Sequence, residues 1–98
     1  MQVNYTKETS KLTVVPEGRI DTLSAPELEK KLGEILGGVT ELVLDMAKVE
    51  YVSSAGLRVI LKIQKIMLRQ GKMKLISVNE SVMEVFEITG FSDILNIE

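Results

Sequence analysis

The sequence of 98 residues contains no cysteine and no histidine, and these two absences restrict its chemistry strongly. Without cysteine the chain has no disulfide, no thiolate nucleophile and no Cys-ligated zinc site. Without histidine it has no Ser-His-Asp triad and lacks the commonest metal ligand of proteins. The sequence therefore predicts no catalytic residues, no metal site and no cofactor, which favours a binding protein over an enzyme.

The sequence also has no long apolar run, little net charge and few aromatic residues. The apolar stretch Val59–Leu61 is soon interrupted by Lys62 and Lys65, so no membrane span is predicted. The polar start of the chain, 1–6, does not have the pattern of a signal peptide. A net charge of −2 with 4% aromatic residues argues against nucleic-acid binding. We predict a cytoplasmic protein that folds as a single domain over residues 1–98.

Hydrophobic periodicity predicts two strands followed by alternating helices and strands. Strand patterns cover 3–6, 11–15, 19–21, 41–45, 72–77 and 94–97, with 16–18 as an interruption. Helices are expected from Ser24 to the Gly37-Gly38 pair, from Ser54 to Gln70, and from Ser81 to Gly90; Ser24 and Ser81 each have capping-box spacing. This order predicts an α/β fold, a mixed β-sheet of about four or five strands with helices packed against it.

The heptapeptide 51–57, Tyr-Val-Ser-Ser-Ala-Gly-Leu, stands between a predicted strand and the longest predicted helix. One of Ser53 and Ser54 can cap that helix, while the other can stand exposed among unbonded N–H groups. Gly56 allows another molecule to approach closely, or serves only close packing of the helix on a strand. The hydroxyl pair is the first candidate site.

Acidic residues are the last residues of two of the predicted strands. Asp21 and Asp45 each stand at a strand end, so both are expected on the same rim of the sheet as the serine pair, unless they serve only as turn residues. Carboxylates near a serine suit Mg²⁺-dependent phosphoryl transfer by an external kinase. The nucleotide would come with that kinase, because this chain has no glycine-rich phosphate loop.

Four basic residues follow one face of the longest predicted helix, namely Arg58, Lys62, Lys65 and Arg69. Such a stripe is either the solvated side of an amphipathic helix or a docking surface for an acidic partner. Its start beside Ser54 supports the second reading. The methionines are most simply explained as core residues.

The segment 42–61, Leu-Val-Leu-Asp-Met-Ala-Lys-Val-Glu-Tyr-Val-Ser-Ser-Ala-Gly-Leu-Arg-Val-Ile-Leu, resembles the central signature of STAS domains, and among them the bacterial anti-sigma factor antagonists. That signature is a strand ending in an acidic or amide residue, an apolar-aromatic pair, and Asp-Ser-x-Gly-Leu opening a helix. Gly18-Arg19-Ile20-Asp21 is similar to a second family motif. The resemblance extends over nearly the whole chain.

The resemblance implies a phosphorylation switch. Ser54, two residues before the glycine, would be phosphorylated by a cognate anti-sigma factor that is also a serine kinase. The unphosphorylated form would bind that kinase and release the sigma factor, and a phosphatase would reset the system. Asp21 would lie near Ser54. The partner-binding residues expected on this basis are Asp21, Ser53, Ser54, Gly56, Arg58 and Lys62.

Two departures from the family pattern matter. Ser53 stands where the phosphorylated branch has Asp, which makes Ser53 a second candidate acceptor, and the sequence ends at Glu98 where many relatives add a helix. Alternative functions are an adaptor subunit of an ABC-type transport or lipid-trafficking complex with no phosphorylation switch, and a small hydrolase using Ser54. The free protein is expected to be monomeric.

Overall fold

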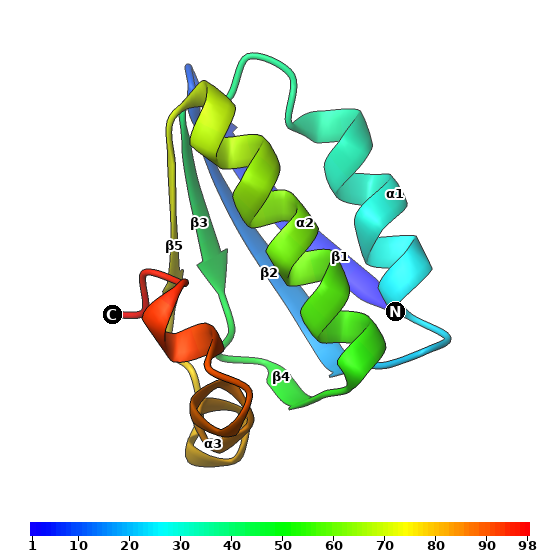
Figure 1. Ribbon diagram of the computed structural model, residues 1–98. Helices are drawn as coiled ribbons and strands as arrows, with labels where there is room; N and C mark the ends of the chain where they lie inside the picture. Colours follow the sequence, from blue (N-terminus) through cyan, green and yellow to red (C-terminus); the bar gives the residue numbers. More distant parts are fainter.

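The structure, a computed structural model, describes all residues 1–98. Five strands and three α-helices follow one another along the chain, with a short 3-10 turn at Phe91–Asp93 near its end (Figure 1). In chain order the elements are β1 Gln2–Glu8, β2 Lys11–Ile20, α1 Ala25–Ile35, β3 Glu41–Asp45, β4 Val49–Val52, α2 Ser54–Gln70, β5 Lys72–Ile76 and α3 Glu80–Ile88. The predicted α/β fold with a mixed sheet is confirmed.

The sheet is organised around β2. Its strand order is β1-β2-β3-β5, with β4 also paired to β2. β1 pairs with β2 antiparallel, whereas β3 and β4 pair with it in parallel. The first part of β2, from Lys11 to Val14, bonds to β3, and its last part, from Gly18 to Ile20, bonds to β4. One strand therefore carries the main sheet at one end and the short β4 at the other.

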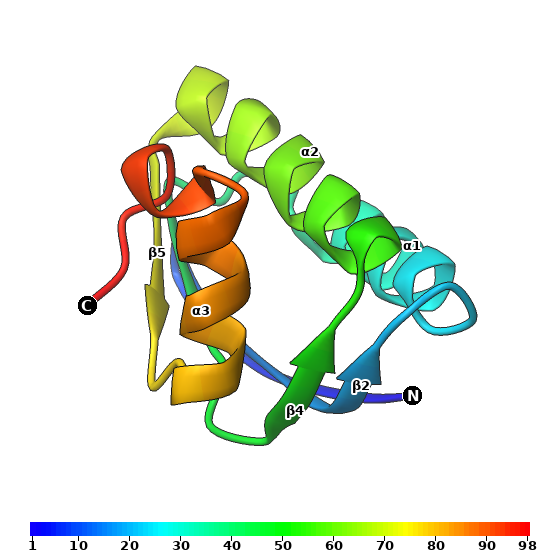
Figure 2. The ribbon, with the colours of Figure 1, turned by 60° about the horizontal axis from the view of Figure 1, so that its bottom comes forward.

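Helices α1 and α2 cover one face of the sheet, and α3 lies at its lower end beside β4 (Figures 1 and 2). On the covered face the strands bury alternate apolar side chains, including Leu12, Val14, Leu42 and Leu44. α2 buries a stripe that includes Ile60, Ile63 and Met67. The core therefore lies between the sheet and the helices, as hydrophobic alternation requires.

Several local predictions were wrong. Residues 16–18 do not interrupt β2, because Pro16 lies beyond the β3 pairing and before the β4 pairing, where β2 has no parallel partner. β4 was not predicted, and the strand expected at 94–97 is reduced to a single bridge between Leu75 and Ile97. By contrast, the helix predicted over 54–70 is confirmed.

Neither predicted capping box is formed. Ser24 occupies the N-cap position of α1 in a helical conformation, and its hydroxyl makes no capping bond. α3 begins at Glu80, one residue before Ser81, and its cap is Asn79, whose side-chain oxygen accepts the N–H of Val82 at 2.8 Å. An extended Asn at this position is a good cap, so it displaces the serine that follows it. None of the helices has the length and apolar character needed to cross a membrane.

Candidate functional site

The serine pair lies at the junction where β4 passes directly into α2. Val52, the last residue of β4, pairs with Ile20 at the end of β2. The backbone N–H of Ser53 then donates to the Ile20 carbonyl at 2.8 Å, which extends the contact one residue beyond the strand. The start of α2 is thereby fixed to the carboxyl end of β2, the edge at which α/β proteins commonly carry their sites.

The structure gives the two serines different positions. Ser53 has an extended backbone, and its side-chain oxygen accepts the N–H of Gly56 at 3.3 Å, so Ser53 is the N-cap. Ser54 is the first helical residue; it is exposed, and its hydroxyl has no hydrogen-bond partner in the protein. No cavity of the structure is lined by Ser54. The exposed hydroxyl of the predicted pair is therefore that of Ser54.

Gly56 has a packing role. A β-carbon at this position would stand 2.6 Å from the Ile20 carbonyl oxygen, 2.8 Å from Ile20 Cγ2 and 3.0 Å from Val52 Cγ1. The residue is buried against β2 and β4, so the space beside it is filled by the protein itself. Of its two sequence interpretations, close packing of helix on strand is the one that the contacts support. The place of Gly56 in the partner-binding surface stays a prediction.

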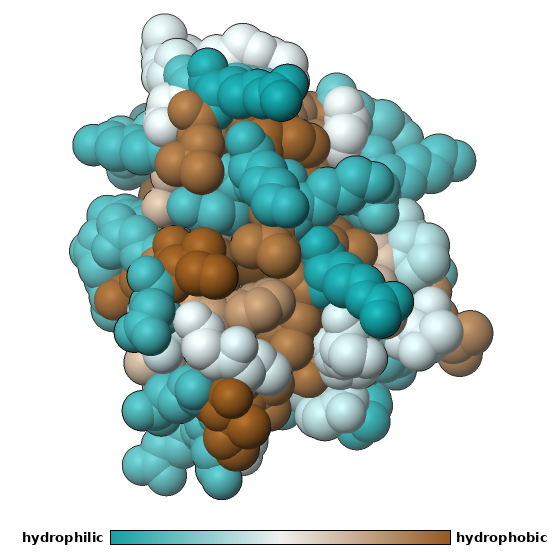
Figure 3. Space-filling view, viewed as in Figure 1, coloured by the Kyte–Doolittle hydropathy of each residue, from teal (hydrophilic) through white to brown (hydrophobic).

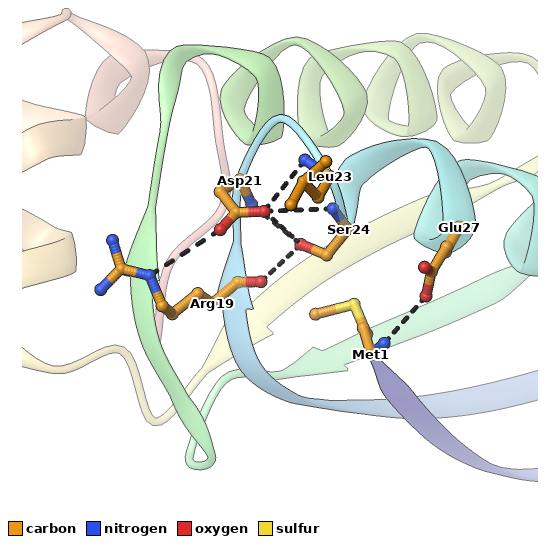
Figure 4. A network of polar contacts seen from close by, with 6 residues as sticks. All are labelled: Met1, Arg19, Asp21, Leu23, Ser24 and Glu27. Atoms are coloured by element: carbon orange, nitrogen blue, oxygen red, sulfur yellow. Dashed lines mark hydrogen bonds and ion pairs between the residues drawn. The ribbon is translucent and has the colours of Figure 1, made fainter.

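Asp21 organises the turn that follows β2 (Figure 4). Its Oδ1 accepts the backbone N–H groups of Leu23 and Ser24, each at 3.1 Å. The buried Ser24 hydroxyl accepts the Asp21 N–H at 2.9 Å and donates to the Arg19 carbonyl. The N–H of Ser24 has the largest effect on the pKa of Asp21 and lowers it. Desolvation comes second and raises the pKa, but the Leu23 N–H, the Ser24 hydroxyl and the Arg19 guanidinium also lower it, so the net shift is downward. Asp21 is therefore a carboxylate fixed within this turn.

Arg19 joins this turn to β4, and sequence reasoning did not include it among the site residues. Its Nε lies 3.8 Å from Asp21 Oδ2, and its guanidinium stands 4.5 Å from the centre of the Tyr51 ring. Tyr51 is 40% exposed and Leu23 is 84% exposed, so two apolar side chains border the charged pair. The signal in the sequence was the position of Arg19 inside the motif 18–21 and that of Tyr51 inside 51–57.

Asp45 is not part of this site. In the register of β3 with β2, Leu44 lies opposite Val14, which leaves Asp45 level with Val15. Asp21, the residue directly after β2, is six residues further along the chain than Val15, about 20 Å away at 3.3 Å per residue. The Asp45 side chain accepts the N–H of Ala47 at 3.0 Å, a local turn bond. Asp45 is therefore a turn residue. Of the two aspartates, only Asp21 lies at the same edge of the sheet as the serine pair.

The basic stripe is exposed along α2, but its members differ in their contacts. Lys62 reaches across to α1 and pairs with Glu29 at 2.7 Å. Arg58, Lys65 and Arg69 are exposed and have no ion pair. No cluster of three or more carboxylates that could hold a metal ion is present. The surface around Ser54 thus combines one fixed carboxylate, exposed apolar groups and the unpaired cation of Arg58.

Known proteins resemble this chain along almost its whole length. The family model of the STAS domain matches residues 2–98. BtrV of Bordetella bronchiseptica, a candidate anti-sigma factor antagonist, is 34% identical over 99 residues, covering 99% of this chain and 85% of that protein. The anti-sigma-B factor antagonist of Bacillus subtilis is 32% identical over 98 residues, covering 99% and 90%.

Solved structures share the fold at lower identity. SpoIIAA, an anti-sigma factor antagonist, has been solved in its unphosphorylated form, which matches with a TM-score of 0.83 at 14% identity and covers 99% of this chain and 88% of SpoIIAA. The phosphorylated form of Bacillus SpoIIAA matches with a TM-score of 0.74 at 14% identity, covering 99% and 91%. The family match, the relatives and the shared fold agree, and the chain belongs to the STAS domain family.

Proposed function

We propose that this protein is an anti-sigma factor antagonist switched by phosphorylation of Ser54. In the unphosphorylated form it binds a cognate anti-sigma factor that is also a serine kinase, and the sigma factor is released. The observation that carries the proposal is the free, exposed hydroxyl of Ser54 at the first position of α2. The names of the two sequence relatives support it, and the existence of a phosphorylated SpoIIAA supports the chemical step.

The phosphoryl transfer takes its catalytic groups from the kinase. The Ser54 oxygen attacks the γ-phosphorus of ATP, the bond to the bridging oxygen of ADP breaks, and the hydroxyl proton leaves to a base on the kinase. In this proposal the chain is a substrate and a binding surface, acting in the cytoplasm. Ser53 stays the second candidate acceptor, but its side-chain oxygen already caps α2.

The start of α2 suits a phosphate electrostatically. The N–H groups of Ser54 and Ala55 belong to the first turn of α2, where no preceding carbonyl is available to them. These groups and the helix dipole stabilise an anion at this end. α2 also has no acidic residue in its first turn to oppose it. Phosphorylation therefore does not require the domain to unfold.

The same charge weakens binding of the partner. A phosphate adds about 1.5 to 2 negative charges beside a surface that we assign to the kinase, comprising Asp21, Ser53, Arg58 and Lys62. A partner carboxylate seated over Ser54 would be repelled by the phosphate, and a partner apolar side chain there would desolvate it. Either effect costs several kcal/mol. Because about 1.4 kcal/mol is a factor of ten, release is expected to be nearly complete. A phosphatase would restore the binding form.

Intact-mass spectrometry after incubation with ATP and the cognate kinase tests the acceptor. We expect a gain of one phosphate in the wild type and in Ser53→Ala, and no gain in Ser54→Ala. A phosphate that persists in Ser54→Ala and is lost in Ser53→Ala would move the site to Ser53. A wild type that takes up no phosphate would overturn the proposal.

Affinity capture with wild-type, Ser54→Ala and Ser54→Asp proteins tests whether a negative charge at position 54 releases the kinase. The kinase should be recovered with the first two proteins and lost with the third. Equal recovery of the same partners by all three would favour the alternative, an adaptor of a transport or lipid-trafficking complex.

A further inference from the structure

Arg58 lies one helical turn beyond Ser54 on the outer face of α2. Both residues are exposed, and both belong to the regular helix that begins at Ser54. Gly56, midway between them, is buried against β2 and β4, so the face that carries Ser54 and Arg58 is turned away from the sheet. In the space-filling view, hydrophilic side chains follow this outer face along α2 (Figure 3). Residues four apart on a helix have β-carbons about 5–6 Å apart, so the two side chains are direct neighbours.

The geometry of the helix directs Arg58 toward Ser54. Side chains of an α-helix lean toward its N-terminus, so the residue four positions further on leans over the earlier one. An acidic group on the N-terminal side of a cation at this spacing is also the more favourable order. The guanidinium is planar, and its paired N–H donors match two oxygens of a phosphate. A phosphate on Ser54 therefore meets Arg58 without any rearrangement of the backbone.

Arg58 is free to make such a contact. It has no ion pair and no cation–π contact in the protein. Lys62, two turns beyond Ser54, is already paired with Glu29 at 2.7 Å. Arg19, near the end of β2, already has an acidic and an aromatic partner. Arg58 is therefore the cation on α2 that is both nearest to the acceptor and unpaired.

The unphosphorylated helix leaves the charge of Arg58 uncompensated. Arg58 stands near the N-terminal end of α2, where the helix dipole disfavours a cation. It also precedes Lys62 by four residues, a spacing at which like charges are unfavourable. α2 contains no acidic residue that could offset these effects. A phosphate on Ser54 supplies about 1.5 to 2 negative charges at the place where this compensation is missing.

We propose that a phosphate on Ser54 forms an ion pair with Arg58 and thereby withdraws this cation from the kinase-binding surface. The inference rests on the proposed function, and it adds a second cause of release to the repulsion by the phosphate. A carboxylate of the kinase that pairs with Arg58 in the complex loses its partner when the phosphate takes that place. The pair forms within one chain, so it carries no cost of association.

Phosphoserine incorporated at position 54 during translation tests the pair without any kinase. A ³¹P NMR titration measures the second pKa of the phosphate, which is about 6 in an unperturbed phosphoserine. Because a cation stabilises the dianion, Arg58→Gln should raise this pKa by about 0.2 to 0.4. Arg69→Gln is the matched control and should leave it unchanged, since Arg69 is also exposed and unpaired but lies fifteen residues beyond Ser54, about 22 Å along α2. Equal pKa values in the wild type and Arg58→Gln would overturn the proposal.

Salt and a conservative variant make the titration specific. The difference between the wild type and Arg58→Gln should shrink in 1 M NaCl, where the Debye length is about 3 Å. Arg58→Lys keeps the charge but not the paired donors, so its phosphate pKa should lie between the two. Asp21 and Arg19, the other charged groups at this edge of the sheet, are the same in all these proteins. A difference that persists undiminished in salt would indicate altered helix structure and contradict an ion pair.

The withdrawal of Arg58 is tested by calorimetric titration of the kinase with the same proteins. Phosphoserine at position 54 should lower the affinity for the kinase by a factor at least about twofold smaller in Arg58→Gln than in the wild type, because the cation is already absent there. Equal factors would show that the phosphate acts through its own charge alone and would overturn the withdrawal. The proposed function fails separately, through a wild type that takes up no phosphate from the kinase, whatever the ³¹P titration gives.

Discussion

Replacing Gly56 by alanine tests whether the start of α2 is held by close packing. The new β-carbon would stand 2.6 Å from the Ile20 carbonyl oxygen, whereas ordinary contact begins at 3.4 Å. α2 and β2 must therefore separate by about 0.8 Å at this point, against the bond from Ser53 to Ile20. Overpacking of this kind costs about 1–3 kcal/mol. The better helix propensity of alanine returns at most about 1 kcal/mol.

The net expectation for Gly56→Ala is a loss of about 0–2 kcal/mol in the free energy of unfolding, measured by urea denaturation with circular dichroism. For a domain of this size each kcal/mol lowers Tm by about 4–8 °C. Gly33→Ala is the matched control, because Gly33 lies in α1 with no atom within 4 Å of the added β-carbon. That variant should be more stable by about 0.5 kcal/mol. Equal gains for both variants would refute the packing argument.

Three further predictions concern polar side chains. Asn79→Ala should destabilise the protein by about 1–2 kcal/mol in urea denaturation, because Asn79 caps α3 and also donates to the Val49 carbonyl at 2.9 Å; full stability of this variant would contradict the assigned cap. Ser53→Ala should cost about 1 kcal/mol through loss of the α2 cap, whereas Ser54→Ala should remain within about 0.5 kcal/mol of the wild type, and the reverse order would exchange their structural roles. Because the pKa of Asp21 is lowered in the folded state, ionised Asp21 adds stability above its unfolded pKa of about 4, and this stability is lost as pH falls through the folded value. Asp21→Asn should therefore lose less stability than the wild type between neutral pH and the acid range in pH-dependent urea titrations, and parallel curves would exclude this contribution.

The long, strongly periodic elements were predictable from the sequence, and those that depend on distant partners were not. α2 and β3 have the predicted bounds because their apolar patterns are regular and local. β4 is only four residues long, and its pairing with β2 joins segments some thirty residues apart, which no local pattern reveals. The predicted cap at Ser24 was wrong for a similar reason, because the Ser24 hydroxyl bonds to the Asp21 N–H and the Arg19 carbonyl and leaves α1 uncapped.

The candidate site was only partly predictable. The motif at 51–57 identified the two hydroxyls, but their separation into a cap and an exposed group needed the backbone geometry at Ser53. The contact of Arg19 with Tyr51 depends on the parallel register of β2 and β4, so it had no local signal.

The position of β2 has a consequence for how the domain opens. Its amides are bonded to β1 on one side and to β3 and β4 on the other. Fraying of β1 or loosening of α3 leaves the parallel pairs intact, so no partial opening frees the whole strand. The slowest hydrogen exchange should therefore be found in β2, at the free energy of global unfolding. Ser54, the proposed phosphate acceptor, is thus attached through Ser53 to the last part of the molecule to come apart.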